Sequence, residues 1–125
     1  MRHLILLAAT VPALAFALAP VPAHAAELWC MPAEVCRDAA CKPTTDEESS
    51  VRLTDPDGPA PSLRAQAETI AMTKTYDGPV QQWEGLNDSG AAEILAMQTS
   101  DMAFTYLRLH PDGSQATATG ICERQ

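Results

Sequence analysis

Four cysteines constrain the fold of this 125-residue chain more than any other feature of its sequence. Three of them, Cys30, Cys36 and Cys41, lie within twelve residues, and the fourth is Cys122. An even number of cysteines in a small exported chain predicts two disulfides, for which three pairings are possible. We favour Cys30–Cys122 with Cys36–Cys41, because the segments around Cys30 and Cys122 resemble terminal strands. Cys30–Cys36 with Cys41–Cys122 is the main alternative.

Residues 1–25 have the layout of a secretory signal peptide: a short polar start, an apolar run and small residues before a cleavage position after Ala25. Prolines interrupt the apolar run, which is shorter than the roughly 20 residues that a membrane span needs. We therefore expect a periplasmic or secreted protein that keeps no membrane anchor after cleavage. Residues 26–125 are expected to form a single disulfide-stabilised β domain.

The chain is strongly acidic, with 16 Asp and Glu residues against 8 Lys and Arg residues and a formal net charge of −8. Nucleic acids and anionic lipid surfaces are bound by clusters of basic residues, so this composition argues against both as partners. A cationic protein partner stays open. So does the simpler interpretation that the charge keeps an exported protein soluble.

Turn signals recur about every ten residues after Ser62, a spacing that is typical of an antiparallel meander. The segments between the turns are rich in β-branched and aromatic residues, which favour strands. The predicted strands lie near 27–31, 50–54, 62–67, 68–76, 80–86, 91–99, 102–110 and 114–122. Seven or eight antiparallel strands suffice for a small β-barrel or β-sandwich, and a Cys30–Cys122 disulfide would join its first and last strands.

The periodicity of apolar residues does not decide between helix and strand for two segments, whereas in others it predicts which residues share one face of a strand. Segments 62–72 and 90–98 carry helical signals as well; we leave the first open and favour a strand for the second, because it lies between two turns. Segment 114–122 alternates threonine and glutamine with alanine and glycine, so it has one face of small residues. We expect Trp83 and Tyr76 to pack in a core that has few other aromatic residues.

The sequence offers little for catalysis. His110 is the single histidine after residue 25, and it lies where a predicted strand enters a turn. A catalytic triad would need this histidine beside a serine or a reduced cysteine, and the sequence contains no G-x-S-x-G motif. We predict that the protein has no catalytic residue and is not an enzyme.

Metal-binding patterns are equally weak, so we predict no metal site and no cofactor. The segment 55–58 lacks the further oxygen ligands and the closing glutamate of a calcium loop. Exported copper proteins use methionine and histidine. The chain has these residue types without a clustered motif, and two of the methionines fit better as core residues, namely Met72 and Met97. The available copper ligands are Met31, Met72, Met97, Met102 and His110.

Binding through loops is the remaining possibility, because loops on a rigid scaffold commonly carry function. The chain resembles the small disulfide-tied β-barrel proteins of the bacterial periplasm, some of which inhibit lysozymes or proteases. The resemblance lies in the leader, the size, the cysteines near both ends of the domain and the meander pattern. The resemblance implies a non-catalytic binding or inhibitor protein. From the residues themselves, we expect such a protein to engage a cationic partner through its acidic loops. Its candidate contact residues are Asp46, Glu47, Glu48, Asp55 and Asp57. The alternative is a carrier for a small ligand or copper, which would use the mouth of the barrel and His110.

Overall fold

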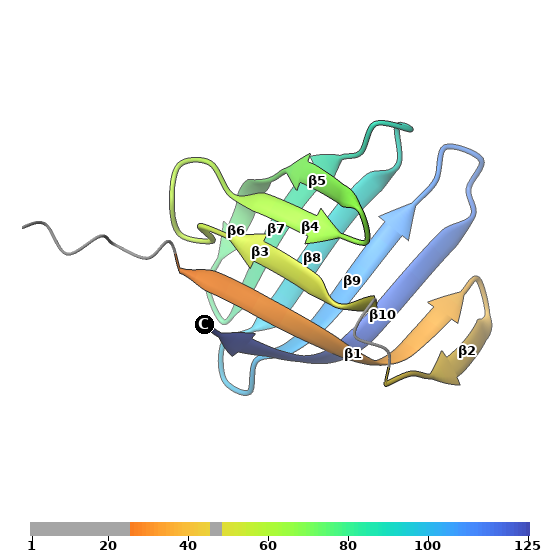
Figure 1. Ribbon diagram of the computed structural model, residues 1–125, viewed down its shortest axis with the longest axis horizontal. Coiled ribbons are helices and arrows are strands. Elements are labelled where there is room, and N and C mark those ends of the chain that lie inside the picture. The colour runs from red at the N-terminus through yellow and green to blue at the C-terminus, as the bar shows by residue number, and fades with distance from the viewer. Residues whose placement is uncertain (1–25, 46–48) are drawn as a thin grey trace, which may run out of the picture.

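One antiparallel sheet of ten strands curls into a nearly closed barrel in the computed structural model, which describes residues 26–45 and 49–125 (Figure 1). The strands are β1 (Glu27–Arg37), β2 (Ala40–Pro43), β3 (Val51–Thr54), β4 (Ser62–Ala65), β5 (Glu68–Ala71), β6 (Thr73–Asp77), β7 (Val80–Leu86), β8 (Ala92–Gln98), β9 (Ala103–Leu109) and β10 (Gln115–Arg124). Their order in the sheet is β5-β4-β3-β1-β10-β9-β8-β7-β6, and β2 pairs with β1. The predicted mainly-β antiparallel fold is confirmed. The described residues include no helix with the length and apolar character of a membrane span.

The barrel closes where β5 and β7 meet without a ladder of hydrogen bonds between them. Gly85 on β7 faces the end of β5, and a side chain at this position would collide with the carbonyl oxygen of Ala71 and the sulfur of Met72. Glycine is therefore required at position 85, because it lets the two strands approach closely enough to seal the core.

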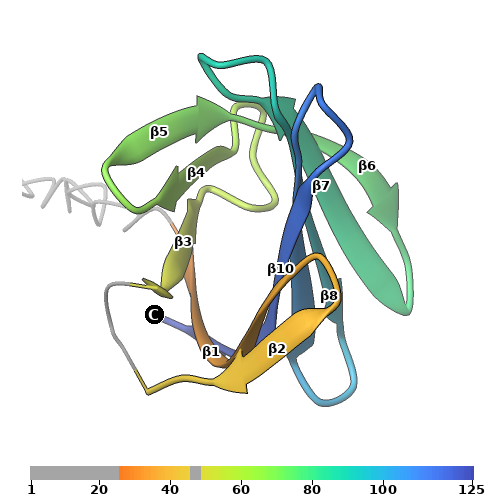
Figure 2. The ribbon, with the colours of Figure 1, turned by 90° about the vertical axis from the view of Figure 1, so that its right-hand side faces the viewer.

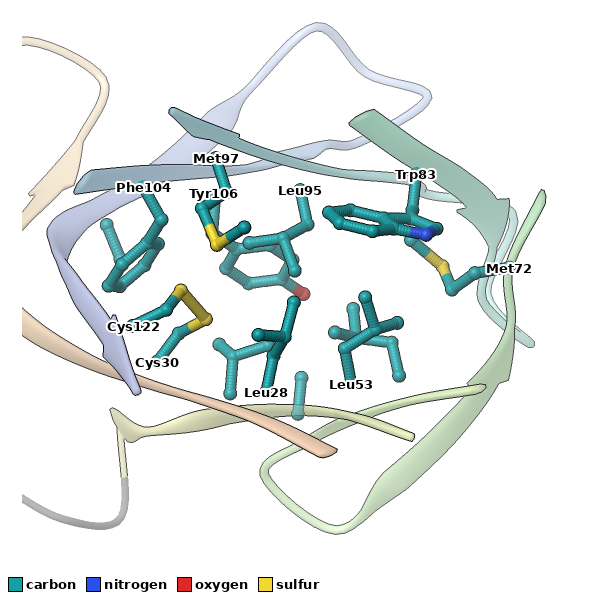
Figure 3. Packing of buried hydrophobic residues seen from close by; sticks show 14 of the residues in the cluster. Leu28, Cys30, Leu53, Met72, Trp83, Leu95, Met97, Phe104, Tyr106 and Cys122 are labelled. Carbon is teal, nitrogen blue, oxygen red and sulfur yellow. A yellow bond between two sulfur atoms is a disulfide. The ribbon is translucent and has the colours of Figure 1, made fainter. Parts of the chain in front are cut away.

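Alternate residues of the strands point into the barrel and form its core. Figure 3 shows the Cys30–Cys122 disulfide packed between Phe104 and Leu28 inside this core. The largest side chain in the core is Trp83, which is fully buried. The predicted core positions of Trp83, Met72 and Met97 are confirmed.

The predicted core position of Tyr76 is wrong, since this residue is 57% exposed. It lies on β6, an edge strand that pairs with β7 alone. The pairing register of β6 with β7 shifts by one residue after Lys74. The ring of Tyr76 then lies against Gly78 in the following turn. Hairpin geometry thus places the ring outside the barrel, although its residue type favoured burial.

The structure has more strands than the seven or eight predicted. Segment 62–72, which the sequence left unassigned between helix and strand, forms a hairpin of β4 and β5. The chain then bends at Met72, whose N–H donates to the carbonyl of Pro61 at 2.9 Å. This bend divides the predicted strand 68–76 into β5 and β6. Segment 90–98 contains strand β8, as favoured, because its alternate residues are buried between β7 and β9. Strand β2 was not predicted, since all four of its residues are exposed.

Both favoured disulfides are confirmed, which excludes the alternative pairing. Each joins residues directly opposite one another on paired strands: Cys30 and Cys122 on β1 and β10, and Cys36 and Cys41 on β1 and β2. The predicted signal peptide, residues 1–25, lies outside the described residues.

Candidate functional site

Strand β1 changes its partner along its length, and this change opens the barrel at one end. Its first part, from Glu27 to Cys30, pairs with β3. A bulge at Ala33 follows, and from Glu34 onward the same edge pairs with β2 instead. Figure 2 faces this end of the barrel and shows β2 and β3 diverging from one another. We call it the open end.

Gly120 on β10 makes the bulge possible. A side chain at this position would collide with the carbonyl oxygen of Met31 and would lie 2.9 Å from the Cα of Pro32. The backbone of β1 therefore folds directly over Gly120 as it turns from one partner strand to the other. The carbonyl group of the bulged residue, Ala33, accepts a hydrogen bond from the Thr44 N–H at 3.0 Å, which ties the end of β2 to β1.

A cleft of about 760 Å³ occupies the open end. It lies between the β1–β2 hairpin, the first residues of β3, the end of β4, and the ends of β9 and β10 that meet at their turn. Small side chains on its walls leave this space free, among them Ala65, Ala116 and Ala118. Clefts of roughly 300–1,000 Å³ are typical of small-molecule sites, so the size fits a ligand of that class.

The registers of four neighbouring strands define which side chains share the inner face of the sheet at the cleft; those on β9, β10 and β1 line it, whereas those on β8 are buried beside it. In the mouth row, nearest the open end, the opposed residues from β8 to β1 are Glu93, Arg108, Ala116 and Arg37. In the inner row, one step deeper, they are Leu95, Tyr106, Ala118 and Val35. Opposed residues share one face of a sheet. The mouth row is therefore polar apart from Ala116, and the inner row is apolar apart from the hydroxyl of Tyr106.

Glu93 is fully buried beside the cleft and accepts hydrogen bonds from three side chains. Its Oε1 accepts from Arg108 Nε at 2.6 Å and from Asn87 Nδ2 at 3.0 Å, and its Oε2 accepts from the hydroxyl of Tyr106. The amide oxygen of Asn87 in turn accepts from the backbone N–H groups of Ser89 and Ala91 in the β7–β8 turn. A buried carboxylate needs such partners, because an unpaired one would be costly to desolvate.

The network shifts the titration of its tyrosine and arginine. Burial and the hydrogen bond to Glu93 together raise the pKa of Tyr106 well above its usual range, so the phenol keeps its proton as a donor. Burial acts to lower the pKa of Arg108, but the neighbouring Tyr106 and Glu93 outweigh it and raise this pKa overall. Arg108 therefore stays a fixed cation whose side chain is 18% exposed, next to the cleft.

The charged residues of the cleft contrast with the charge of the whole chain. Among the described residues that line it, Arg37, Lys42 and Arg108 are cations, whereas Asp38 is the one acid. His110 lies on the same wall. Within the described residues, neither Arg37 nor Lys42 forms an ion pair. Among the described residues, the lining of this cleft therefore carries more positive than negative charge, although the chain as a whole is acidic.

Of the predicted acidic contact residues, two are described, and neither of these lines the cleft. Asp46, Glu47 and Glu48 lie outside the described residues. Asp55 and Asp57 lie in the β3–β4 turn, at the opposite end of the barrel from the cleft. The carboxylate of Asp57 accepts a hydrogen bond from Lys74 at 2.9 Å and lies 3.9 Å from Arg124, so its charge is already paired.

The residues available for the alternative copper-carrier hypothesis do not converge either. Met102 directly precedes β9, whereas His110 directly follows it. The two residues therefore lie at opposite ends of a seven-residue strand, which is roughly 20–25 Å long. Met72 and Met97 are buried in the core. The described residues contain one cluster with the spacing of metal ligands, formed by Glu34 with Cys36 and Cys41. Its two sulfur atoms are joined in a disulfide, so they are not available as thiolate ligands.

Sequence reasoning missed the residues that build the cleft, although one signal pointed to it. The face of small residues on segment 114–122 includes Ala116 and Ala118, and small inward residues on one strand leave space inside a barrel. Nothing local marks Glu93 or Arg108 as partners, since they are 15 residues apart and meet through the β8–β9 register.

Comparisons of the chain with protein-family models, with curated proteins and with solved structures find no match. The function therefore has to be inferred from the chemistry of the cleft.

Proposed function

We propose that this chain is an exported, non-catalytic protein that binds a small molecule in the cleft at the open end of its barrel. The observation that carries the proposal is the cleft itself, about 760 Å³ in volume and lined by an apolar inner row beneath a polar mouth row. Ligand sites combine these features: apolar walls supply most of the contact, and a few placed polar groups orient the ligand. The signal-peptide pattern and the two disulfides support export.

The groups around the cleft support binding rather than catalysis. Tyr106 and Arg108 are held in their protonated forms by Glu93, so they act as hydrogen-bond donors and not as proton acceptors. Ser114, which also lines the cleft, donates its hydroxyl to Asp112 at 2.6 Å within the β9–β10 turn. A nucleophile would instead need a base that takes its proton and an oxyanion site opposite.

Filling the cleft tests the proposal. An uncharged fluorescent probe, N-phenyl-1-naphthylamine, is titrated into the purified protein with both disulfides formed, and saturable fluorescence is expected. Ala116→Phe places a ring between Arg108 and Arg37 and should abolish this binding. Thr119→Phe is the matched control, because it adds the same ring to the exposed outer face of the same strand. Circular dichroism establishes that both variants are folded.

Two results would overturn the proposal. One is a wild-type protein that shows no saturable probe binding. The other is probe binding that Ala116→Phe leaves unchanged, since the probe would then occupy a different surface. Loss of binding in Ala116→Phe, with binding retained in Thr119→Phe, supports the cleft.

A further inference from the structure

We propose that the ligand of the cleft is an amphipathic carboxylate, whose charged group lies between Arg37 and Arg108 and whose apolar body covers the inner row. This inference rests on the proposed function and adds the chemical class of the ligand. It follows from three features of the site: a guanidinium that is held in place, a second guanidinium on the same row, and a charge distribution that admits one small anion.

Arg108 is oriented before any ligand arrives. Its Nε donates to the buried Glu93 at 2.6 Å, and its Nη2 lies 3.5 Å from the hydroxyl of Tyr106. A guanidinium carries five donor hydrogens, so these contacts leave further donors for another acceptor. Because Glu93 already fixes the side chain, a ligand that binds Arg108 loses little affinity to the ordering of this residue.

We assign buried Glu93 the role of holding the guanidinium of Arg108 in place. A buried ion pair is weak evidence for stability, since well-packed apolar residues of similar size often do as well. The pair instead fixes an arginine at the boundary between the core and the cleft, where an aliphatic residue could not bind an anion. We infer that the Asn87–Glu93–Arg108 chain of hydrogen bonds positions the ligand contact.

Arg37 supplies the second guanidinium. It stands in the mouth row two strands from Arg108, a separation of roughly 10 Å between backbones. Ala116 lies between them and its methyl group leaves the intervening space open. Two long arginine side chains can converge across such a gap on one carboxylate, which accepts bidentate, charge-assisted hydrogen bonds from guanidinium groups.

The inner row defines the rest of the ligand. Beneath the two arginines lie the ring of Tyr106 and the small apolar side chains of Ala118 and Val35. Burial of apolar ligand surface against these groups is favourable, whereas a fully polar anion would gain nothing from them. The chain's net charge of −8 disfavours polyanions at longer range. A single carboxylate with an apolar body satisfies both conditions.

Three probes that share one alkyl chain test the inference: octanoate, octan-1-ol and octylammonium. Each is used to displace N-phenyl-1-naphthylamine from the purified, disulfide-bonded protein. Octanoate is expected to bind about tenfold or more tightly than octan-1-ol, because hydrogen bonds to charged groups are worth about that factor. Octylammonium is expected to be the weakest of the three.

Arg37→Gln is the decisive variant. Arg37 is exposed and forms no ion pair with another described residue, so the change should leave folding intact. It should weaken octanoate by about tenfold and weaken octan-1-ol much less, because a neutral hydroxyl accepts a weaker hydrogen bond from a guanidinium than a carboxylate does. Arg64→Gln is the matched control, because Arg64 is an exposed arginine on β4 that does not line the cleft.

The two proposals fail in distinguishable ways. If octanoate binds no better than octan-1-ol, or if Arg37→Gln and Arg64→Gln weaken octanoate equally, the carboxylate inference is wrong, while the binding of the uncharged probe still supports the cleft. If the uncharged probe itself does not bind, or if Ala116→Phe leaves it bound, both proposals fail.

Discussion

At one end of the barrel the β3–β4 turn folds over the interior, whereas at the other end β3 diverges from β1 and the interior is exposed to the cleft. At the first end, which we call the closed end, Pro56 is fully buried and its carbonyl accepts a hydrogen bond from Trp83 Nε1 at 2.9 Å. At the open end the corresponding space is bounded by Tyr106 and small alanines. The sheet is continuous, yet one end is packed and the other is hollow.

The two ends also use charge differently. Lys74 at the closed end is paired with Asp57 at 2.9 Å and with Asp77 at 3.2 Å, and its Nζ lies 5.6 Å from the centre of the Trp83 ring. Arg37 at the open end has no acidic partner among the described residues. Lys74 is therefore neutralised within the fold, whereas no described acidic residue balances the charge of Arg37. We propose that the packed end has a structural role and that the hollow end holds the ligand site.

Removing the two disulfides one at a time should give the largest difference in the free energy of unfolding between a change in the core and a change at the open end. Cys30 and Cys122 are 92 residues apart in sequence and lie in the core, so replacing both with alanine should lower the free energy of unfolding by about 4–5 kcal/mol. Cys36 and Cys41 are 5 residues apart at the open end, and their loss should cost about 2 kcal/mol at most. Urea unfolding of the two double variants measures both values, and equal losses would contradict the comparison.

Truncating one apolar side chain in each region should give the next largest effect. Leu53→Ala leaves an enclosed cavity in the core and is expected to cost about 2–5 kcal/mol. Val35→Ala enlarges a cleft that is already open, so we expect only the transfer free energy of the lost carbons, about 1–2 kcal/mol. Urea unfolding reports both costs. If the loss of unfolding free energy per removed carbon is the same at the two sites, the cleft is packed as tightly as the core, which would contradict the comparison.

Tyr106→Phe should show a pH signature of the network beneath the cleft. At neutral pH the variant loses a donor to buried Glu93, which should cost about 1–3 kcal/mol. The raised pKa of Tyr106 means that above about pH 10, the usual tyrosine value, the unfolded chain releases a proton that the folded chain keeps. The native state then binds more protons, so its stability falls as pH rises from about 10 toward the folded pKa.

The variant lacks this alkaline loss, so the stability gap between wild type and Tyr106→Phe should narrow above about pH 10. The pKa of Lys74 is also raised, because the hydrogen bonds and charges of Asp57 and Asp77 outweigh its burial. Its contribution is common to both proteins and cancels in their difference. Tyr76→Phe, at an exposed tyrosine, serves as the control and should leave stability unchanged. A gap that stays constant with pH would show that the phenol is not coupled to folding.

The sequence was sufficient for the fold class and the cross-links, because both depend on patterns that are visible along the chain. Turn spacing and alternation predicted an antiparallel barrel or sandwich, and the segments around Cys30 and Cys122 favoured the long disulfide over its alternative. The same patterns missed β2, whose four exposed residues carry no alternation. They also misplaced Tyr76, because an edge hairpin with a shifted register determines its exposure.

The cleft was beyond sequence reasoning for a physical reason. It depends on where β1 leaves β3, which is fixed by a bulge over Gly120 and not by any residue type that binds ligands. Its charged residues come from different strands and become neighbours only through the register. Acidic residues, by contrast, are conspicuous in the sequence. Asp57 therefore drew attention as a contact residue, although the structure pairs it with Lys74.

Neutralising Asp57 should have the smallest effect and tests whether the closed end is structural. Its side chain is 57% exposed, so Asp57→Asn should cost no more than about 1 kcal/mol, and added salt should remove most of that cost by screening the pair. Octanoate binding at the opposite end should not change. Urea unfolding at low and high salt and probe displacement measure these outcomes. A large loss of octanoate affinity would mean that the two ends are coupled, and the division into a packed, paired end and a hollow, charged end would then be wrong.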